Sequence, residues 1–345
     1  MRGMTLPRTQ SQYQLRKQAQ GYRLELVNDV PVRAPGANEV VLKVRATSIN
    51  RRDVMIRRGF YPAGDRDRVI PLSDGAGEVV ATGAAVTRFK EGDRAAAIFF
   101  QNWWQGRPTS TTGASALGGA TDGMLSEYVT LDENGLVAVP ASLSLEEAAT
   151  LPCAAVTAWN GLVSRGEMRE GDRVLLLGTG GVSVFGLQFA VAAGAQAFIT
   201  SSSDEKLERA RKLGAAGTLN YVTTPEWAEP IRQMSQGGIE QVLEVGGANT
   251  LAQSLAVLAP GGHIAIIGGL SGFGGQIPAA SLIANTTAIS GIFVGSRAHF
   301  EAMNAFIETY RIKPVIDAVI DYANADDAYA LMESSRHFGK IVIRH

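Results

Sequence analysis

The amino-acid sequence predicts an α/β protein with two domains: a β-rich, barrel-like part and a doubly wound parallel sheet with helices on both faces. Residues 1 to about 145 hold short apolar or alternating runs separated by turn signals. From Asp172 onward, strand-like and helix-like segments alternate, which demands parallel strands. A glycine-rich turn follows the first of these strands. A chain of 345 residues also favours two domains.

The composition excludes several classes of protein. The net charge of −1 leaves no basic footprint for nucleic acid or an anionic membrane. One cysteine rules out an internal disulfide and a thiolate-rich zinc cluster. No apolar run reaches the length of a membrane span, which is about 18 residues, and the basic start of the chain lacks the apolar stretch of a secretory signal. We therefore expect a soluble cytoplasmic enzyme that acts on a small molecule.

The elements of the first part are short. Ser144, followed by two glutamates, predicts a helix start, and Pro152 predicts a kink or a break into two helices before Val163. The region 101–122 is rich in Gly, Ser and Thr and predicts a long loop carrying Trp103 and Trp104. The predicted strands are 22–27, 40–46, 77–82 and 94–99.

The second part predicts a regular alternation. A helix is expected directly after the glycine turn, on the helical apolar spacing of Val182, Phe185, Phe189, Ala192 and Ala193. Asp204 is expected to cap the next helix. The predicted strands are 174–177, 196–200, 217–220, 241–245 and 263–267, and the predicted helices are 204–213, 225–235 and 249–258. A helix at 297–310, a strand at 315–320, a helix at 326–333 and a strand at 340–343 are expected to end the chain.

The turn after residues 174–177 has the pattern of a dinucleotide-binding loop. Gly178 and Gly180 occupy the first two positions of G-x-G-x-x-G, and Ser183 replaces the third glycine. Gly178 allows a tight turn, and Gly180, with Gly181 and Val182 after it, lets a pyrophosphate approach the helix start. The alternative is a purely structural βα turn, since glycine-rich turns after strands are common.

Six segments spread along nearly the whole chain carry a family resemblance, and one of them begins within the glycine loop. They are SINRRD (48–53), RRGFYP (57–62), PLSDGAGEVVATG (71–83), FKEGDR (89–94), GGVSVFGLQFA (180–190) and GKIVI (339–343). In order and spacing they resemble the medium-chain dehydrogenases/reductases, and most of all their quinone-oxidoreductase branch. The resemblance implies a GroES-like catalytic domain at 1–145 and 296–345 and a Rossmann domain at 146–295. It also implies an active site in the cleft between them and a homodimer or homotetramer.

Zinc-dependent members of that superfamily differ from this chain at their metal ligands. By the resemblance, Asn50 stands where they have a cysteine, and Ser73 and Asp74 stand where they have a His–Glu pair. Only Cys153 falls at a position that matches a ligand, while a catalytic zinc needs about three protein ligands. The four histidines lie in the second half of the chain. We therefore expect no metal site, with Cys153 a small packed residue.

Without a Lewis acid, alcohol oxidation is hard to activate, whereas hydride transfer to a conjugated acceptor is easier. The hypothesis is reduction of quinones or α,β-unsaturated carbonyls. The resemblance suggests Tyr61 as a proton donor or carbonyl partner, Asn50 as a partner of substrate or the nicotinamide ribose, and Asp53 as a third candidate. Two of these residues also have a purely structural interpretation. Tyr61 could be packed at the edge of a domain, and Asp53 could be a structural acid in a turn.

The coenzyme is expected to be NADP, with NADPH favoured over NADH. The second strand ends in Ser201, Ser202 and Ser203 rather than in the acidic residue that binds the ribose hydroxyl of NAD. Lys206 can add positive charge, whereas Asp204 would repel a phosphate if it pointed inward. The serines could instead form an ordinary polar loop.

The resemblance adds contacts at the other parts of the coenzyme. It points to Tyr221 on the adenine side and to six residues at the nicotinamide end, namely Thr157, Gly268, Leu270, Phe293, Val294 and Lys340. Trp103 and Trp104 are expected either to wall a hydrophobic substrate site or to mark an oligomer contact. Two rival functions stay open: an alcohol dehydrogenase with an unseen metal site, and a catalytically idle NADPH-binding sensor.

Overall fold

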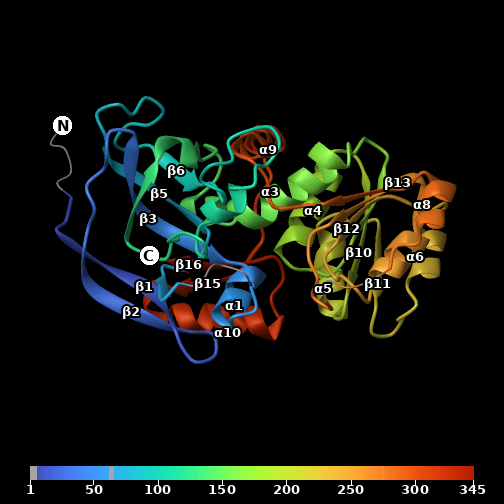
Figure 1. Cartoon of the computed structure of the whole chain (residues 1–345). Helices are drawn as coiled ribbons and strands as arrows, with labels where there is room; N and C mark the ends of the chain where they lie inside the picture. Colours follow the sequence, from blue (N-terminus) through green and yellow to red (C-terminus); the bar gives the residue numbers. More distant parts are fainter. Residues whose placement is uncertain (1–5, 62–65, 273, 275) are drawn as a thin grey trace. The chain divides into compact units, whose positions relative to one another are not determined.

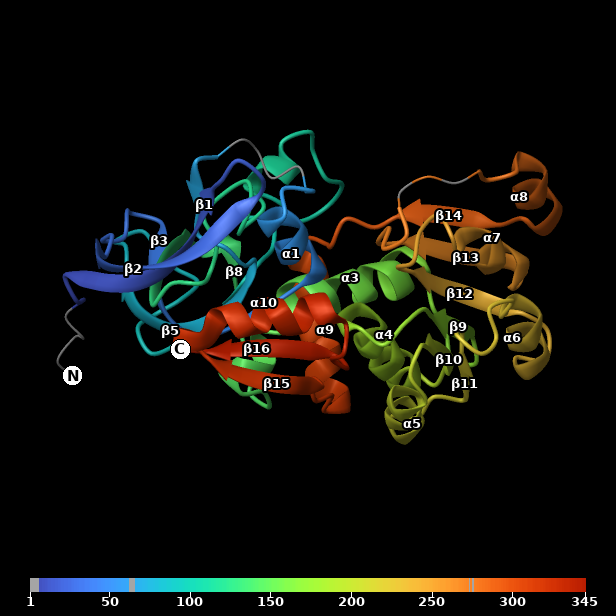
Figure 2. The same ribbon diagram turned by 90° about the horizontal axis from the view of Figure 1, so that it is seen from below.

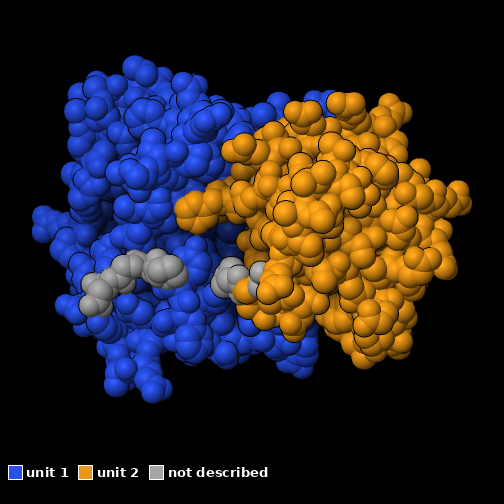
Figure 3. All heavy atoms as spheres, turned by 45° about the vertical axis from the view of Figure 1, so that its right-hand side comes forward, with its two compact units in different colours: residues 1–153, 295–345 blue, residues 154–294 orange. Residues whose placement is uncertain are grey.

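A computed structural model of the chain describes residues 6–61, 66–272, 274 and 276–345. The start of the chain, and Pro62 at the end of the RRGFYP segment, lie outside the described residues. The chain divides into two compact units, coloured in Figure 3. Unit 1 comprises Met1–Cys153 and Gly295–His345, and unit 2 comprises Ala154–Val294.

Unit 1 is built on β-sheets. One sheet has the strand order β2-β1-β4; the other has the order β15-β16-β3-β5-β6-β8, with β7 also paired to β3 (Figure 1). Its strands are β1 (Thr9–Lys17), β2 (Tyr22–Pro31), β3 (Glu39–Ile49), β4 (Arg68–Val69), β5 (Asp74–Thr82), β6 (Arg94–Ala97), β7 (Tyr128–Asp132), β8 (Leu136–Ala138), β15 (Ile316–Asp321) and β16 (Lys340–Arg344). Its helices are α1 (Arg51–Arg57), α2 (Leu145–Ala148), α9 (Arg297–Tyr310) and α10 (Ala325–Ser334).

Strand β3 is the centre of unit 1 because it pairs with three other strands. It is buried along most of its length, and Val40, Leu42 and Val44 pack into one apolar cluster with Val79. The last strand of the chain, β16, runs antiparallel to β3, with Ile341 opposite Ile49. Residues from the two ends of the sequence therefore lie side by side.

Unit 2 contains a six-stranded sheet in the order β11-β10-β9-β12-β13-β14, with every neighbouring pair parallel. This confirms the predicted fold class, a Rossmann-type sheet beside a GroES-like part. The strands are β9 (Arg173–Leu176), β10 (Gln196–Ser201), β11 (Gly217–Asn220), β12 (Ile239–Glu244), β13 (Leu258–Ile266) and β14 (Ala288–Gly291). The helices are α3 (Val156–Trp159), α4 (Gly181–Ala192), α5 (Asp204–Lys212), α6 (Ala228–Met234), α7 (Leu251–Ala256) and α8 (Ala279–Asn285).

The sheet of unit 2 is covered on both faces, as Figure 2 shows. On one face, strand residues such as Leu175 and Val242 pack against Trp227 and Ile231 at α6. On the other face, a Cβ added at Gly186 of α4 would come within 2.8 Å of Leu176 and 2.7 Å of Leu243. The absence of a side chain at this position lets α4 approach the sheet closely.

Several local predictions need correction. Ser203, not Asp204, caps α5, because its hydroxyl accepts a hydrogen bond from the Lys206 amide. Around Pro152, where a kink or a break into two helices is predicted, α2 ends at Ala148 and a second helical segment follows, in which π-helical turns, Leu151–Ala155 and Asn160–Arg165, flank α3. The sixth strand, β14, was not predicted, since the sequence AISG is too short to show a pattern. Within the described residues, no helix combines the length and the apolar character needed to cross a membrane.

Candidate functional site

The glycine loop of unit 2 has the geometry expected of a nucleotide cradle. Gly178 has a φ of +71°, which a residue with a side chain rarely adopts. A Cβ built on Gly180, the residue before α4, would meet nothing within 4 Å. The loop thus offers open space at the N-terminus of a helix of 12 residues, where backbone amides and the helix dipole attract an anion. A coenzyme pyrophosphate fits these features.

The structure explains why Ser183 can replace the third glycine of the motif. Its side chain is buried, and its hydroxyl donates a hydrogen bond of 2.7 Å to the carbonyl of Leu177 at the end of β9. The Gly178 amide donates to Thr200 Oγ1 at 3.2 Å, which ties the loop to the neighbouring strand. The small serine therefore keeps α4 close to the sheet.

The end of β10 carries the residues predicted to select NADP. Ser201 is buried and lies 3.3 Å, hydroxyl to hydroxyl, from Thr179 of the glycine loop. Asp204 Oδ1 accepts a hydrogen bond of 2.8 Å from Asn220, which gives this carboxylate a partner on β11. Tyr221 is exposed, and its amide donates to the carbonyl of Ser201. Ser202, Ser203 and Lys206 lie on the same βα turn and the first turn of α5.

The residues predicted at the nicotinamide end also belong to unit 2, except for one. Thr157 is buried in α3, and Val294 has a φ of +50° and accepts a hydrogen bond from buried Asn160. Leu270 and Phe293 are exposed. Gly268 follows β13. The exception is Lys340, which belongs to unit 1.

In unit 1, the register of the sheet brings polar residues together at one end of β3. Ser48 lies opposite Asp74 in the β3–β5 pair, and the β3–β16 pairing sets Lys340 next to Asn50. All of these side chains are buried. We call the group the buried polar cluster; its members are Ser48, Asn50, Arg52, Asp53, Ser73, Asp74 and Lys340.

Lys340 supplies the central cation of the buried polar cluster. Its Nζ donates hydrogen bonds to Asn50 Oδ1 at 2.6 Å and to the carbonyl of Ile49 at 3.0 Å. Asp74 Oδ2 forms an ion pair with the same Nζ at 3.7 Å. Asp74 also accepts hydrogen bonds from the hydroxyls of Ser73 and Ser48, at 2.7 and 3.3 Å. The predicted coenzyme residue Lys340 is therefore bound to the predicted catalytic residue Asn50.

Asp53 stands at the first turn of α1. Its Oδ2 accepts a hydrogen bond of 2.8 Å from the Asn50 amide, and Arg52 Nη1 lies 3.7 Å from its Oδ1. Burial, opposed by the charge of Arg52, raises the pKa of Asp53 to about 6. A carboxyl with this pKa can hold or release a proton near neutral pH.

Tyr61 lies farther along the chain and is partly buried. Its ring packs against Leu15, Ile56 and Val69, and the guanidinium of Arg52 lies 5.4 Å from the ring centre. The same guanidinium lies 4.5 Å from the centre of the Phe99 ring and donates to the carbonyl of Leu117. Arg52 was missed at the sequence level, since nothing in the segment SINRRD distinguishes a buried arginine from an exposed one.

The residues at the expected zinc position do not fit a zinc ion. Among the residues that the structure describes, no group of three or more His, Cys, Asp or Glu side chains could hold a metal. Burial, with the charge of Asp74, raises the pKa of the Cys153 thiol, which agrees with a small packed residue. The ammonium of Lys340 already lies beside Asn50 and Asp74, and it would repel a second cation there.

The predicted tryptophan loop is fastened to α9. The carbonyls of Trp103 and Trp104 accept hydrogen bonds from the first two amides of that helix, those of Arg297 and Ala298. Trp103 is buried, so its ring is part of the packing of unit 1. Trp104 is exposed. Of the two tryptophans, it is therefore the one that can contact a substrate or another subunit.

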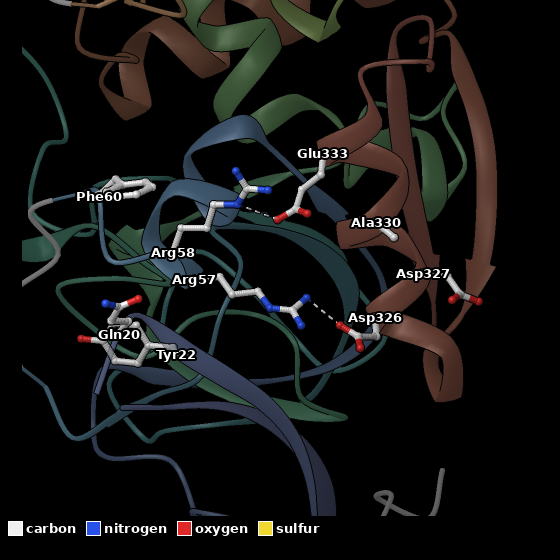
Figure 4. Close-up of a pocket in the computed structure, with 9 residues that line it drawn as sticks. All are labelled: Gln20, Tyr22, Arg57, Arg58, Phe60, Asp326, Asp327, Ala330 and Glu333. Carbon is white, nitrogen blue, oxygen red and sulfur yellow. Dashed lines mark hydrogen bonds and ion pairs between the residues drawn. The ribbon is translucent and has the colours of Figure 1, made fainter. Parts of the chain in front are cut away.

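A surface pocket of about 560 Å³ in unit 1 lies along α1 and α10 (Figure 4). Arg57 pairs with Asp326 at 2.6 Å and Arg58 with Glu333 at 3.1 Å, so its two arginines are neutralised. In the described part of the chain, none of the predicted site residues lines this pocket. Its chemistry does not match hydride transfer.

Comparison with known proteins assigns both units. Residues 36–141 match the alcohol dehydrogenase GroES-like domain, and residues 181–309 match the zinc-binding dehydrogenase family. A zinc-type alcohol dehydrogenase-like protein of Schizosaccharomyces pombe is 48% identical over 313 residues, covering 89% of this chain and 90% of the relative.

Two solved structures extend the comparison. A crystal structure from Sinorhizobium meliloti described as an alcohol dehydrogenase is 38% identical, covers 99% of this chain and 100% of that chain, and has a TM-score of 0.93. The 2-octenoyl-CoA carboxylase reductase CinF, solved with NADP and 2-octenoyl-CoA, is 26% identical, covers 99% of this chain and 88% of that chain, and has a TM-score of 0.84. The chain therefore belongs to the medium-chain dehydrogenase/reductase superfamily, among its zinc-type alcohol dehydrogenase-like members, and is an NAD(P)-dependent oxidoreductase.

Proposed function

We propose that this oxidoreductase reduces a double bond conjugated to a carbonyl, as in an enone or a quinone, with NAD(P)H and without a catalytic metal ion. The observation that carries the proposal is the buried polar cluster. At the positions that the resemblance matches to metal ligands of the superfamily's zinc enzymes, this chain has the amide of Asn50, the hydroxyl of Ser73 and the carboxylate of Asp74. The amide and the carboxylate contact the ammonium of Lys340, and the hydroxyl donates a hydrogen bond to the carboxylate.

The chemistry requires little more than positioning from the protein. When bound, the reduced coenzyme supplies the hydride to the β-carbon of the acceptor, and the conjugated carbonyl takes up the negative charge. Unit 1 contributes hydrogen-bond donors for that oxygen and a proton for the α-carbon. Asn50 is the candidate donor and Tyr61 the candidate proton source.

Similarity to an enoyl reductase supports this substrate class. CinF is described as acting on 2-octenoyl-CoA, whose double bond is conjugated to a thioester carbonyl, and it was solved with NADP. NADPH is proposed as the preferred coenzyme here. The serines at the end of β10 leave room for a 2′-phosphate, and Asn220 donates a hydrogen bond to the carboxylate of Asp204.

The second candidate is an alcohol dehydrogenase, which is favoured by the names of the S. pombe relative and the S. meliloti structure. That reaction needs a Lewis acid or a strong base to remove the alcohol proton, and within the residues that the structure describes no group of three or more His, Cys, Asp or Glu side chains could hold a metal ion.

Steady-state kinetics separate the two candidates. The purified protein is assayed for NADPH oxidation at 340 nm with 2-cyclohexenone, cinnamaldehyde and 1,4-benzoquinone, and for NADP⁺ reduction with primary and secondary alcohols. The proposal predicts turnover with the conjugated acceptors and no zinc requirement. Faster turnover with alcohols, lost on chelation, would establish the dehydrogenase instead. NADPH binding with no turnover of either class would indicate an idle coenzyme-binding protein.

Tyr61→Phe tests the proton source. Loss of the hydroxyl is expected to lower kcat for 2-cyclohexenone by about 100-fold, because general acid catalysis typically contributes this much. The ring that packs against Leu15 and Ile56 is retained, so stability should be preserved. Unchanged turnover would remove the tyrosine from the mechanism.

A further inference from the structure

The side chain of Asn50 has one satisfied end and one unsatisfied end. Its Oδ1 accepts the hydrogen bond from Lys340 Nζ, while its Nδ2 is buried and has no hydrogen-bond partner among the described residues. Buried amide nitrogens are almost always paired, so an orphan donor needs an explanation. A ligand oxygen at this position would complete its hydrogen bonding.

The hydrogen bond from Lys340 determines the orientation of the Asn50 amide, that is, where its oxygen and its nitrogen lie. An ammonium group donates hydrogen bonds and accepts none, so only the oxygen of Asn50 can face it. The lysine itself is buried and is anchored by the carbonyl of Ile49 and the carboxylate of Asp74. Because β16 pairs with β3, these contacts are held by the sheet and not by a loop.

Neighbouring polar atoms do not satisfy the orphan donor. Asp53 binds the backbone amide of Asn50 through Oδ2, and its Oδ1 has no hydrogen-bond partner among the described residues. Asp74 is engaged with Ser48, Ser73 and Lys340. The cluster therefore presents an amide N–H whose direction is fixed and whose acceptor is missing from the described part of the chain.

The geometry points to Asn50 Nδ2 as the donor that receives the carbonyl oxygen of the conjugated substrate, and to Lys340 as the positioning residue that holds the amide in this orientation. The inference rests on the proposed function, since it names the acceptor oxygen of that reaction. An N–H directed at this oxygen gains strength as negative charge develops on it, so it lowers the barrier to hydride addition.

Infrared spectroscopy of a bound carbonyl tests the inference directly. The probe is 2-cyclohexenone labelled with ¹³C at the carbonyl, bound with NADP⁺ so that no turnover occurs. The carbonyl stretch should lie at lower frequency in the wild type than in Asn50→Asp or Asn50→Ala, since both variants lack the donor. Asn304→Asp is the matched control: this amide of unit 1 donates to the carbonyl of Ala138, so its replacement should leave the band unchanged.

Kinetics distinguish a substrate donor from a coenzyme contact. Asn50→Asp and Asn50→Ala should lower kcat for 2-cyclohexenone by about 100-fold, the typical loss for one such donor, while the Kd for NADPH stays within about twofold. A raised Kd for NADPH with an unchanged carbonyl band would overturn the inference, because the amide would then serve the coenzyme.

The role of Lys340 is tested by two variants. Lys340→Met removes the hydrogen bond that orients the Asn50 amide. The carbonyl stretch of bound 2-cyclohexenone should then lie at the higher frequency of the Asn50 variants, and kcat should fall by about 10-fold. Lys340→Arg keeps a donor-only cation and should restore part of both readouts, which a merely structural role would not require. Circular dichroism checks that each variant is folded.

The outcomes for the proposal and the inference can be told apart. Absence of NADPH oxidation with every conjugated acceptor overturns the proposed function. The carbonyl band decides the inference separately. The same frequency in the wild type and in the Asn50 variants, or no bound band in the wild type, overturns it.

Discussion

The glycine loop of unit 2 and the buried polar cluster of unit 1 are built in opposite ways. The loop is a single run of consecutive residues whose backbone makes the binding surface, with Gly178 and Gly180 a few positions apart. The cluster joins side chains from β3, β5, β16 and the start of α1, and Lys340 contacts Asn50, which is 290 positions away in the sequence. The first depends on local conformation and the second on strand register, so they should respond differently to mutation and pH.

The largest expected effect concerns Asp53 in the cluster. Its pKa is raised from 3.8 to about 6, so the folded protein binds the proton more tightly than the unfolded chain does. The free energy of unfolding should therefore fall as pH rises from about 4 to 6, by about 3 kcal/mol from this group. Asp53→Asn does not titrate and should gain that amount relative to the wild type over the same range, measured by urea unfolding at several pH values. A constant difference between the two proteins would contradict the assignment.

The two regions also differ in how much of them the sequence predicts. Gly178, Gly180 and the Ser144 cap are visible because each acts through neighbours within a few residues. The alternation in unit 2 predicts the parallel sheet for the same reason. The Lys340–Asn50 contact could not be predicted from the sequence, because it forms only when β16 pairs with β3. The resemblance to the superfamily identified both residues as candidates. It predicted neither the hydrogen bond between them nor the burial of Arg52.

Gly180→Val tests the loop with the next largest effect. The φ of Gly180 is −78°, and a Cβ meets nothing within 4 Å, so the fold should tolerate the change. The added side chain would occupy the space assigned to the pyrophosphate and raise the Kd for NADPH by about 100-fold, the cost of one or two charge-assisted hydrogen bonds. Binding is followed by quenching of tryptophan fluorescence. Gly274→Val, at another glycine with open space, is the control. An unchanged Kd in Gly180→Val would reject the nucleotide assignment.

A smaller effect is expected for a substitution in unit 2 that changes the preference for NADPH over NADH. Lys206→Ala should lower kcat/KM for NADPH by about 10-fold, as expected for one lost contact with a phosphate, and leave NADH unaffected. Lys212→Ala, at the other end of α5, should change neither value. An equal loss for both coenzymes would show that Lys206 does not recognise the 2′-phosphate.

The smallest effect is expected at the capping box of α2 in unit 1, which Ser144 and Glu147 form. Ser144 accepts a hydrogen bond from the Glu147 amide, and the Glu147 carboxylate accepts one from the Ser144 amide. Ser144→Ala should lower the free energy of unfolding by about 1 kcal/mol, with no change in the pH dependence attributed to Asp53. Thermal unfolding at pH 5 and pH 7 measures both quantities. A larger loss at one pH would mean that the cap and the cluster are coupled.

The central claim is that the Lys340 ammonium and the Asn50 amide stand where a metal ion would otherwise act. The direct measurement is the zinc content of the active, purified enzyme by mass spectrometry, with NADPH-dependent reduction of 2-cyclohexenone assayed before and after treatment with 1,10-phenanthroline. The account predicts far less than one zinc per chain and an unchanged rate. One tightly bound zinc per chain, whose removal abolishes turnover and whose return restores it, would contradict the account.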